Sequence, residues 1–196
     1  MTETQVNFST KVDIELEVNA LLSHYYDFIA AGRQLLPKLT LYTDEQPFLT
    51  IDSRTYDEPE DGSEADRNKA IMEMLYLMPP LAPELAILSF SDPVKLTTGL
   101  EFSVIILAVN RLGALCKVFP YTEFEGETTY DMDAQLDPHS PQVYSQYVQH
   151  MLQVFVRTRK MAQLPTELIA FLSNKGHEVS LLGEFDENNL NTRFYF

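Results

Sequence analysis

Carboxylates are the residues of this chain whose number and spacing point most clearly to chemistry. The stretch TYDEPEDGSEAD, residues 55–66, places six of them close together with no cation among them: Asp57, Glu58, Glu60, Asp61, Glu64 and Asp66. Such a run is compatible with a metal site, with a solvated loop or with a surface that meets a basic partner. The rest of the chain has to decide between these interpretations.

A second acidic stretch lies between residues 123 and 137 and holds six acids and no cation. Glu123, Glu125 and Glu127 alternate with other residues, and an extended strand would place their carboxylates on one face, about 6.6 to 6.8 Å apart. With such a spacing a protein could imitate the phosphates of a nucleic acid. Asp131 and Asp133 follow in the same stretch.

The second stretch resembles the start of an EF-hand calcium loop, but the match fails. Asp131, Asp133, Gln135 and Asp137 have the odd-numbered spacing of the ligands. Leu136 stands where the loop needs glycine, and Gln142 stands where a bidentate glutamate belongs. The four histidines lie far apart in the sequence without an H-E-x-x-H pairing. We therefore expect no bound metal and no cofactor.

Other catalytic motifs are missing as well. The seven glycines form neither a dinucleotide-binding turn nor a P-loop, and there is no G-x-S-x-G elbow of a serine hydrolase. Cys116, the one cysteine, stands in a predicted strand, where a free cysteine is usually a small buried hydrophobe. Residues far apart in sequence can still converge in a fold, so a hydrolase or nuclease remains the alternative to a non-enzymatic protein.

The overall charge limits the partners that we expect. Lys and Arg number 14 against 29 Asp and Glu, a formal net charge of −15. Such a charge disfavours direct binding to nucleic acid or to an anionic membrane. No apolar run is long enough to span a bilayer, and the first ten residues lack the features of a signal peptide. We expect a cytoplasmic protein.

The elements that must position these acids indicate one α+β domain over residues 1–196. The β-rich runs LAILSF, EFSVIILAVN and ALCKVF predict an antiparallel meander over residues 85–120, with a hairpin turn near Gly113. The unbroken apolar run from Val104 to Val109 predicts a central strand covered on both faces. LTLYT and PFLTID predict a further strand pair, and EVSLLGEF predicts a last strand.

Three to four helices are expected to pack on this sheet. Helical periodicity predicts them near residues 12–31, 64–78, 142–160 and 165–175, although residues 11–18 also alternate in the manner of a strand. Ser63 predicts the start of the second helix, and Pro79 and Pro80 predict its end. The cations near residue 160 suit the end of the third helix. We expect these residues to be buried: Leu75, Ile105, Leu107, Leu152 and Phe155.

The two acidic stretches remain the most distinctive feature. Residues 53–62 should form an exposed acidic loop, because the acids repel one another and Pro59 and Gly62 oppose regular structure. The simplest explanation is a solvated, soluble surface. The sharper hypothesis is an interaction protein, of an inhibitor or nucleic-acid-mimic type, that binds a basic protein partner. The predicted contact residues are Asp57, Glu58, Glu60, Asp61, Glu64, Glu123, Glu125, Glu127, Asp131 and Asp133.

Overall fold

A computed structural model of the chain describes residues 4–6, 8–31, 35–43, 45–53, 64–76, 78–135, 137, 144–156 and 165–182. Its helices are α1 (Ile14–Ala30), α2 (Glu64–Leu75), α3 (Met78–Leu81), α4 (Ser145–Val156) and α5 (Pro165–Asn174). Its strands are β1 (Thr4–Val6), β2 (Lys38–Thr43), β3 (Gln46–Asp52), β4 (Leu85–Lys95), β5 (Leu100–Asn110), β6 (Ala114–Phe124), β7 (Glu127–Tyr130) and β8 (Glu178–Leu181). The predicted α+β class is confirmed.

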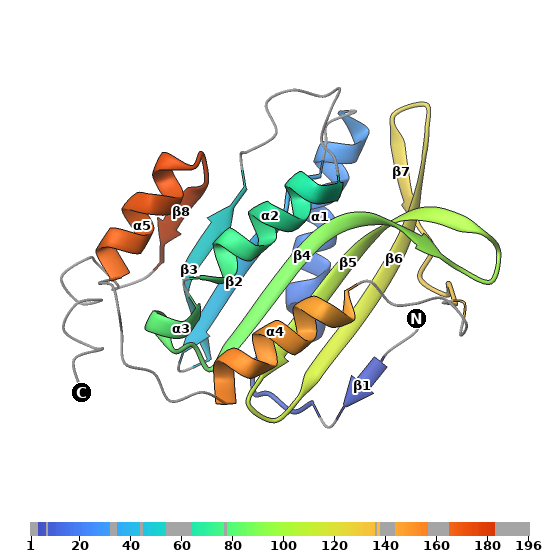
Figure 1. Cartoon of the computed structure of the whole chain (residues 1–196). Coiled ribbons are helices and arrows are strands. Elements are labelled where there is room, and N and C mark those ends of the chain that lie inside the picture. Colours follow the sequence, from blue (N-terminus) through green and yellow to red (C-terminus); the bar gives the residue numbers. More distant parts are fainter. Residues whose placement is uncertain are drawn as a thin grey trace.

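The strands form one open sheet in which every pairing is antiparallel (Figure 1). Their order is β1-β6-β5-β4-β2-β3-β8, and β7 pairs with the outer part of β6. The predicted meander is confirmed, because β4, β5 and β6 are neighbours. Leu88 lies opposite Leu107, and Leu107 lies opposite Cys116.

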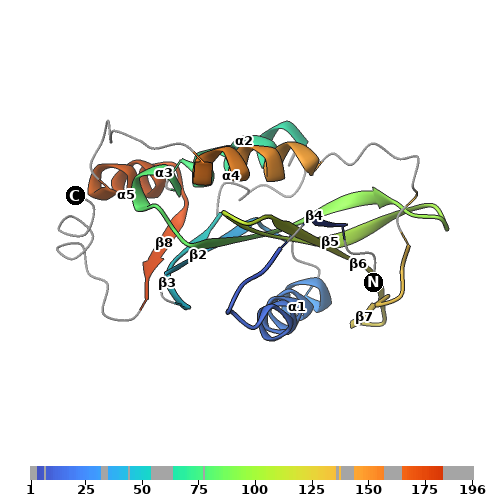
Figure 2. The ribbon, with the colours of Figure 1, turned by 90° about the horizontal axis from the view of Figure 1, so that it is seen from below.

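Helices cover both faces of the sheet (Figure 2). α1 lies on one face, and the other helices lie on the opposite face. Successive strand residues point to opposite faces, so β5 supplies Ile105 and Leu107 to one core and Val104 and Ile106 to the other. All of Val104 to Val109 is buried, as the apolar run predicts. Two separate apolar layers therefore hold the molecule together.

α1 settles whether the chain is helix or strand near residues 11–18. Asp13 caps the helix, since its side chain accepts a hydrogen bond from the N–H of Leu16 at 3.1 Å. Val18, Leu21 and Tyr25 then face the sheet with helical spacing. The strand alternative is wrong from Ile14 onward, because these residues belong to a helix that is capped by Asp13 and buries its apolar residues at helical spacing.

The prolines after α2 do not act as predicted. α2 ends at Leu75, and Pro79 and Pro80 lie inside the short helix α3 instead of ending a helix that reaches residue 78. Proline is tolerated in the first turn of a helix, where its missing N–H has no partner to lose. Leu75 is buried as expected. Ser63, the predicted cap of α2, lies outside the described residues.

α4 packs on the sheet through fewer fully buried residues than predicted. Tyr147, Met151 and Val154 are buried against the sheet, whereas Leu152 and Phe155 are only half-buried. The stripe therefore follows the positions i, i+4 and i+7 counted from Tyr147. The expected burial of Leu152 and Phe155 is wrong in degree. The cations Arg157, Arg159 and Lys160 lie outside the described residues.

The C-terminal elements follow the prediction. α5 ends in a Schellman motif: Gly176 has φ +87°, and the N–H of His177 donates to the carbonyl of Leu172 at 3.0 Å. β8 then pairs with β3, with Asp52 opposite Glu178. Ser53, which follows β3, is buried. The exposed loop predicted for residues 53–62 therefore does not include Ser53. Residues 54–62 lie outside the described residues.

Candidate functional site

Glu123, Glu125 and Glu127 lie on a tight β-hairpin, not on one extended strand. β6 and β7 pair up to Phe124 opposite Glu127, which leaves Glu125 and Gly126 as a two-residue turn. Both turn residues have positive φ, 52° and 81°, as a type I′ turn requires. Gly126 was the signal for this turn: it stands between two runs of alternating residues.

The hairpin changes how the three glutamates are arranged. Residues directly opposite each other share a face, so Glu127 is on the side of Phe124 and Glu123 is on the side of Thr128. The predicted line of three carboxylates on one face is therefore wrong. Glu123, Glu125 and Glu127 are all exposed, but they surround the end of the hairpin from different directions.

Two tyrosines fasten the base of this hairpin to α1. The hydroxyl of Tyr130 donates to the carbonyl of Leu22 at 2.9 Å, and the ring of Tyr130 meets the ring of Tyr121 edge-on with centroids 6.5 Å apart. Burial raises the pKa of the Tyr130 hydroxyl to about 12, so it stays a neutral donor. The hairpin is thus anchored at its base, and its tip projects from the molecule (Figure 1).

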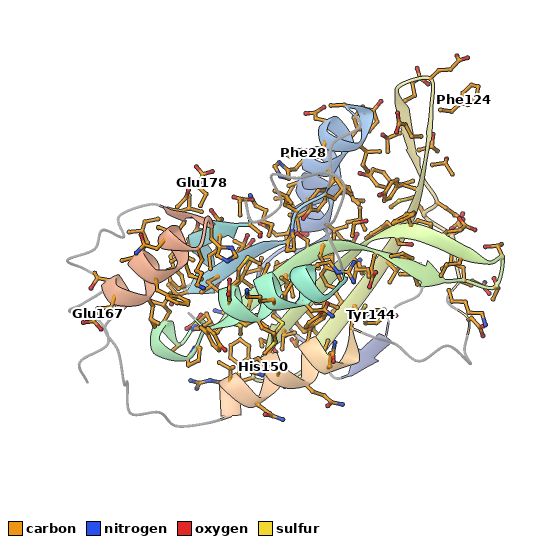
Figure 3. All side chains as sticks on the ribbon, turned by 45° about the horizontal axis from the view of Figure 1, so that its top comes forward. Phe28, Phe124, Tyr144, His150, Glu167 and Glu178 are labelled. Carbon is orange, nitrogen blue, oxygen red and sulfur yellow. The ribbon has the colours of Figure 1, made fainter. Side chains whose placement is uncertain are left out.

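An aromatic side chain stands among the acids at the tip. Phe124 is 74% exposed, and Figure 3 shows it at the end of the hairpin, on the side turned away from α1. Met132, just beyond β7, is exposed as well. We call the following residues the acidic hairpin surface: Glu123, Phe124, Glu125, Glu127, Asp131, Met132 and Asp133.

The charges of this surface are all negative. Asp131 and Asp133 are exposed, and the N–H of Asp133 donates to the carboxylate of Asp131 at 2.9 Å, which makes a local turn. Among the residues that the structure describes, none of the five acids of this surface forms an ion pair. Five of the ten predicted contact residues thus belong to the β6–β7 hairpin or follow it directly: Glu123, Glu125 and Glu127 at its tip, and Asp131 and Asp133 after its base.

The other five predicted contact residues cannot be placed on this surface. Asp57, Glu58, Glu60 and Asp61 lie outside the described residues. Glu64 begins α2, on the helix-covered face opposite α1 (Figure 2). Their part in a common surface therefore stays a prediction from the sequence.

The structure contains a buried acid–histidine pair that was not predicted from the sequence. Nε2 of His177 lies 3.1 Å from a carboxylate oxygen of Glu73, although the two residues are 104 positions apart. Both are buried, and Nδ1 of His177 has no hydrogen-bond partner. Glu73 stands between Met72 and Met74 in an apolar helix, and an acid in that setting needs a partner. The pair joins α2 to the start of β8.

A second polar group lies beside α1 and is partly open to solvent. Lys38 donates to both carboxylate oxygens of Asp52, at 3.0 and 3.2 Å. Burial and the positive charge of Lys38 lower the pKa of nearby His24. The carboxylate already neutralises the ammonium, so the pair has no net charge with which to attract an ionic substrate.

Cys116 is a buried thiol, as predicted. Its side chain lies in the core next to α4, and burial raises the pKa of the thiol to about 12. A thiol with such a pKa is almost entirely protonated near neutral pH, so it is a poor nucleophile. This supports the reading of Cys116 as a small core residue.

The described residues offer neither a metal site nor a membrane-spanning helix. Among the described residues, no three His, Cys, Asp or Glu side chains gather in a way that could hold a metal ion. Within that same part of the chain, no helix combines the length and the apolar character needed to cross a lipid bilayer. No protein-family model, curated protein or solved structure matches the chain.

Proposed function

We propose that the protein is a non-enzymatic interaction protein that binds a basic protein partner through the acidic hairpin surface. The observation that carries this proposal is Phe124, which is 74% exposed at the tip of an anchored hairpin, opposite Glu127 and between Glu123 and Glu125 in the chain. A large exposed aromatic side chain next to carboxylates on a projecting hairpin supports a binding surface, because aromatic residues are enriched at protein interfaces.

The two kinds of side chain have different parts in the proposed binding. Burying a phenylalanine side chain in a partner's pocket gains about 1.5–3 kcal/mol, which lengthens the life of the complex. The five carboxylates attract a positively charged surface over a distance comparable to the Debye length, about 8–10 Å in physiological salt. Their main effect is therefore on the rate of encounter and on the choice of partner.

The backbone of Glu125 supports the same proposal. Its φ of 52° lies in the left-handed region, where a side chain other than that of Gly, Asn or Asp costs about 1–2 kcal/mol. Asn at this position would suit a type I′ turn better. A glutamate at this position thus places a charge at the tip at the expense of stability, which is typical of functional sites.

The second part of the proposed surface is inferred from the sequence alone. It consists of Glu64 at the start of α2 and of four acids that precede it: Asp57, Glu58, Glu60 and Asp61. Their local density of negative charge suits the same basic partner. The regular phosphate-like spacing is not a feature of the hairpin, so the proposal needs only a basic protein and no exact imitation of a nucleic acid.

A photo-crosslinking amino acid in place of Phe124 tests this proposal in cells of the native host. Leu112 is the matched control, because it is also largely exposed, at 65%, but lies in the turn between β5 and β6. We expect position 124 to capture one or a few proteins rich in Lys and Arg that position 112 does not capture. The same products from both positions, or captured proteins without excess positive charge, would refute the proposal.

A further inference from the structure

The β4–β5 hairpin extends beyond the part of the sheet that α1 covers (Figure 1). We call residues 92–103 the β4–β5 arm. The ladder between the two strands continues to its end, with Pro93 opposite Phe102 and Lys95 opposite Leu100. The arm and the acidic hairpin leave the sheet from neighbouring positions, because Ser103 of β5 lies opposite Pro120 of β6.

The chain itself covers one face of this arm. Val94 and Leu96 are buried in the same apolar layer as Ala134. The N–H of Thr97 donates to the carbonyl of Gln135 at 3.0 Å, and the N–H of Asp137 donates to the carbonyl of Lys95 at 3.1 Å. The segment after β7 thus lies across the arm and closes this face.

The opposite face of the arm is apolar and uncovered. Paired residues share a face, so Pro93, Leu100 and Phe102 lie together on the side that faces α1 further along the sheet. Leu100 is 71% exposed and Phe102 is 59% exposed. We call these three residues the bare arm face. Lys95 lies on this face too, and its ammonium is paired with Asp137 at 3.2 Å.

Charge decides what could cover the bare arm face. A second copy of this chain would bring another net charge of −15 and another acidic hairpin close to the first, so self-association through this face is electrostatically unfavourable. A partner with an apolar stripe flanked by cations has no such penalty. Its apolar residues would lie on Phe102 and Leu100 while its cations meet the neighbouring acids.

Glu123 is the part of the acidic hairpin surface that shares a side with the bare arm face. Tyr121 packs in the apolar layer under α1, so Glu123, two positions further along β6, points to the same side of the sheet, whereas Phe124 and Glu127 point to the other side. Phe102 precedes Ser103 by one residue, and Glu123 follows Pro120 by three. With about 3.3 Å per strand residue and about 4.8 Å between strands, Phe102 and Glu123 are at most about 18 Å apart along the backbone. A helix of roughly 12 residues spans this distance.

We infer that the bare arm face and the acids Glu123 and Glu125 of the neighbouring hairpin together bind one basic amphipathic segment of the partner. The inference rests on the proposed function, since the acidic hairpin surface supplies the charge that selects this partner. It adds that the apolar face of the segment docks on Pro93, Leu100 and Phe102. A partner segment with the same cations but no apolar face should bind more weakly.

Two synthetic peptides test the inference with the full chain. The first carries Lys and Leu at helical spacing so that the Leu residues form one face, and the second has the same composition in a scrambled order. The parent should bind the amphipathic peptide more tightly. In the double variant Leu100→Thr and Phe102→Thr we expect roughly tenfold weaker binding of the amphipathic peptide and less than twofold for the scrambled one.

The controls separate the possible outcomes. Leu112→Thr removes an exposed leucine elsewhere and should leave both affinities unchanged. Threonine suits strands, so melting and circular dichroism should show the double variant folded. An arm variant that keeps the preference of the parent for the amphipathic peptide would overturn the inference. So would a parent that sediments as a dimer and becomes a monomer in this variant, because the bare arm face would then belong to a second copy.

The proposed function can fail independently of this inference. Glu123→Gln, Glu125→Gln and Glu127→Gln in one variant should weaken the binding of both peptides at low salt and reduce its salt dependence. If this variant bound both peptides like the parent, the acidic hairpin surface would not attract basic segments and the proposed function would fail. If the arm variant lost the preference for the amphipathic peptide while the Glu→Gln variant bound like the parent, the peptide would still dock on the arm, although the proposed function had failed.

Discussion

Lys117 of β6 donates a hydrogen bond to Glu15 of α1, although the lysine side chain is 1% exposed and the glutamate side chain is 66% exposed. The ammonium lies at the edge of the apolar layer between α1 and the sheet, with Leu115 and Phe119 on the same face of β6. The first turn of α1 thus supplies the charge that allows a lysine to remain in this layer.

This relationship predicts an asymmetric effect of removing either partner. Glu15→Ala leaves a buried ammonium without this partner and should lower the free energy of unfolding by about 1–3 kcal/mol. Lys117→Met replaces the ammonium by an apolar group of similar size and should cost less or even stabilise the fold. Urea unfolding of both variants is the measurement. A larger loss in the free energy of unfolding from Lys117→Met than from Glu15→Ala would show that the lysine stabilises the fold by more than its pairing with Glu15.

The pair of His177 and Glu73 should behave as one unit in a double-mutant cycle. Each single change, Glu73→Ala or His177→Ala, leaves a buried polar partner unsatisfied and should cost about 1–3 kcal/mol beyond the lost packing. The double change Glu73→Ala with His177→Ala removes both polar groups and should cost less than the sum of the single changes. Strict additivity in thermal or urea unfolding would mean that the two side chains do not interact.

Replacing Glu125 should raise the stability of the fold. Glu125→Asn places a residue that tolerates positive φ into the type I′ turn, so the free energy of unfolding should rise by about 0.5–1 kcal/mol. The matched change Glu123→Asn, in a strand, should bring no gain because its backbone is extended. Equal effects of the two changes would argue against a strained turn.

The side of α4 that packs on the sheet can be tested with two truncations. Met151 is fully buried, so Met151→Ala should cost about 2–5 kcal/mol. Phe155 is half-buried, and Phe155→Ala should cost clearly less than the full core value, contrary to the expectation from the sequence. In urea unfolding, a larger loss of the free energy of unfolding for Phe155→Ala would place Phe155, and not Met151, at the centre of this contact. Equal losses would give both residues the same weight and also contradict the prediction.

The long elements were predictable because each carries many residues of one pattern, periodic in the helices and unbroken in the central strand. The run from Val104 to Val109 predicts a strand covered on both faces, and the structure has helices on both. The short strands β1 and β7 span three and four residues, too few for a period to be seen. α4 shows the opposite limit, since an apolar stripe wider than the contact does not fix which of its residues are buried.

The candidate site was only partly predictable. The sequence shows the acids, but their directions depend on the turn at Glu125 and Gly126, which places Glu127 and Glu123 on opposite faces. Phe124 is exposed because the hairpin projects beyond the helix-covered part of the sheet, and an alternating strand gives no sign of this. The contact of Glu73 with His177 joins elements far apart in the chain and has no local signal at the histidine.

The acidic loop can be tested in the same way as the hairpin. If these residues form the exposed loop that the sequence predicts, neutralising Asp57, Glu58, Glu60 and Asp61 with Asn and Gln should leave the melting temperature nearly unchanged, because exposed charges contribute little to stability. If the loop belongs to the proposed surface, association with the captured basic partner should slow and depend less on salt. Unchanged association would restrict the proposed surface to the acidic hairpin.

The central claim is that the carboxylates of the acidic hairpin surface attract a basic partner. The direct measurement is the association rate of the protein captured at position 124, over a salt range of about 20–300 mM. Two variants have the same change in net charge: Glu123→Gln with Glu125→Gln and Glu127→Gln, and the control Asp27→Asn with Glu167→Gln and Glu178→Gln, whose acids are exposed elsewhere. We predict a rate roughly tenfold lower at low salt and a flatter salt dependence for the hairpin variant only. A hairpin variant that associates as fast as the parent, with the same salt dependence, would contradict the claim.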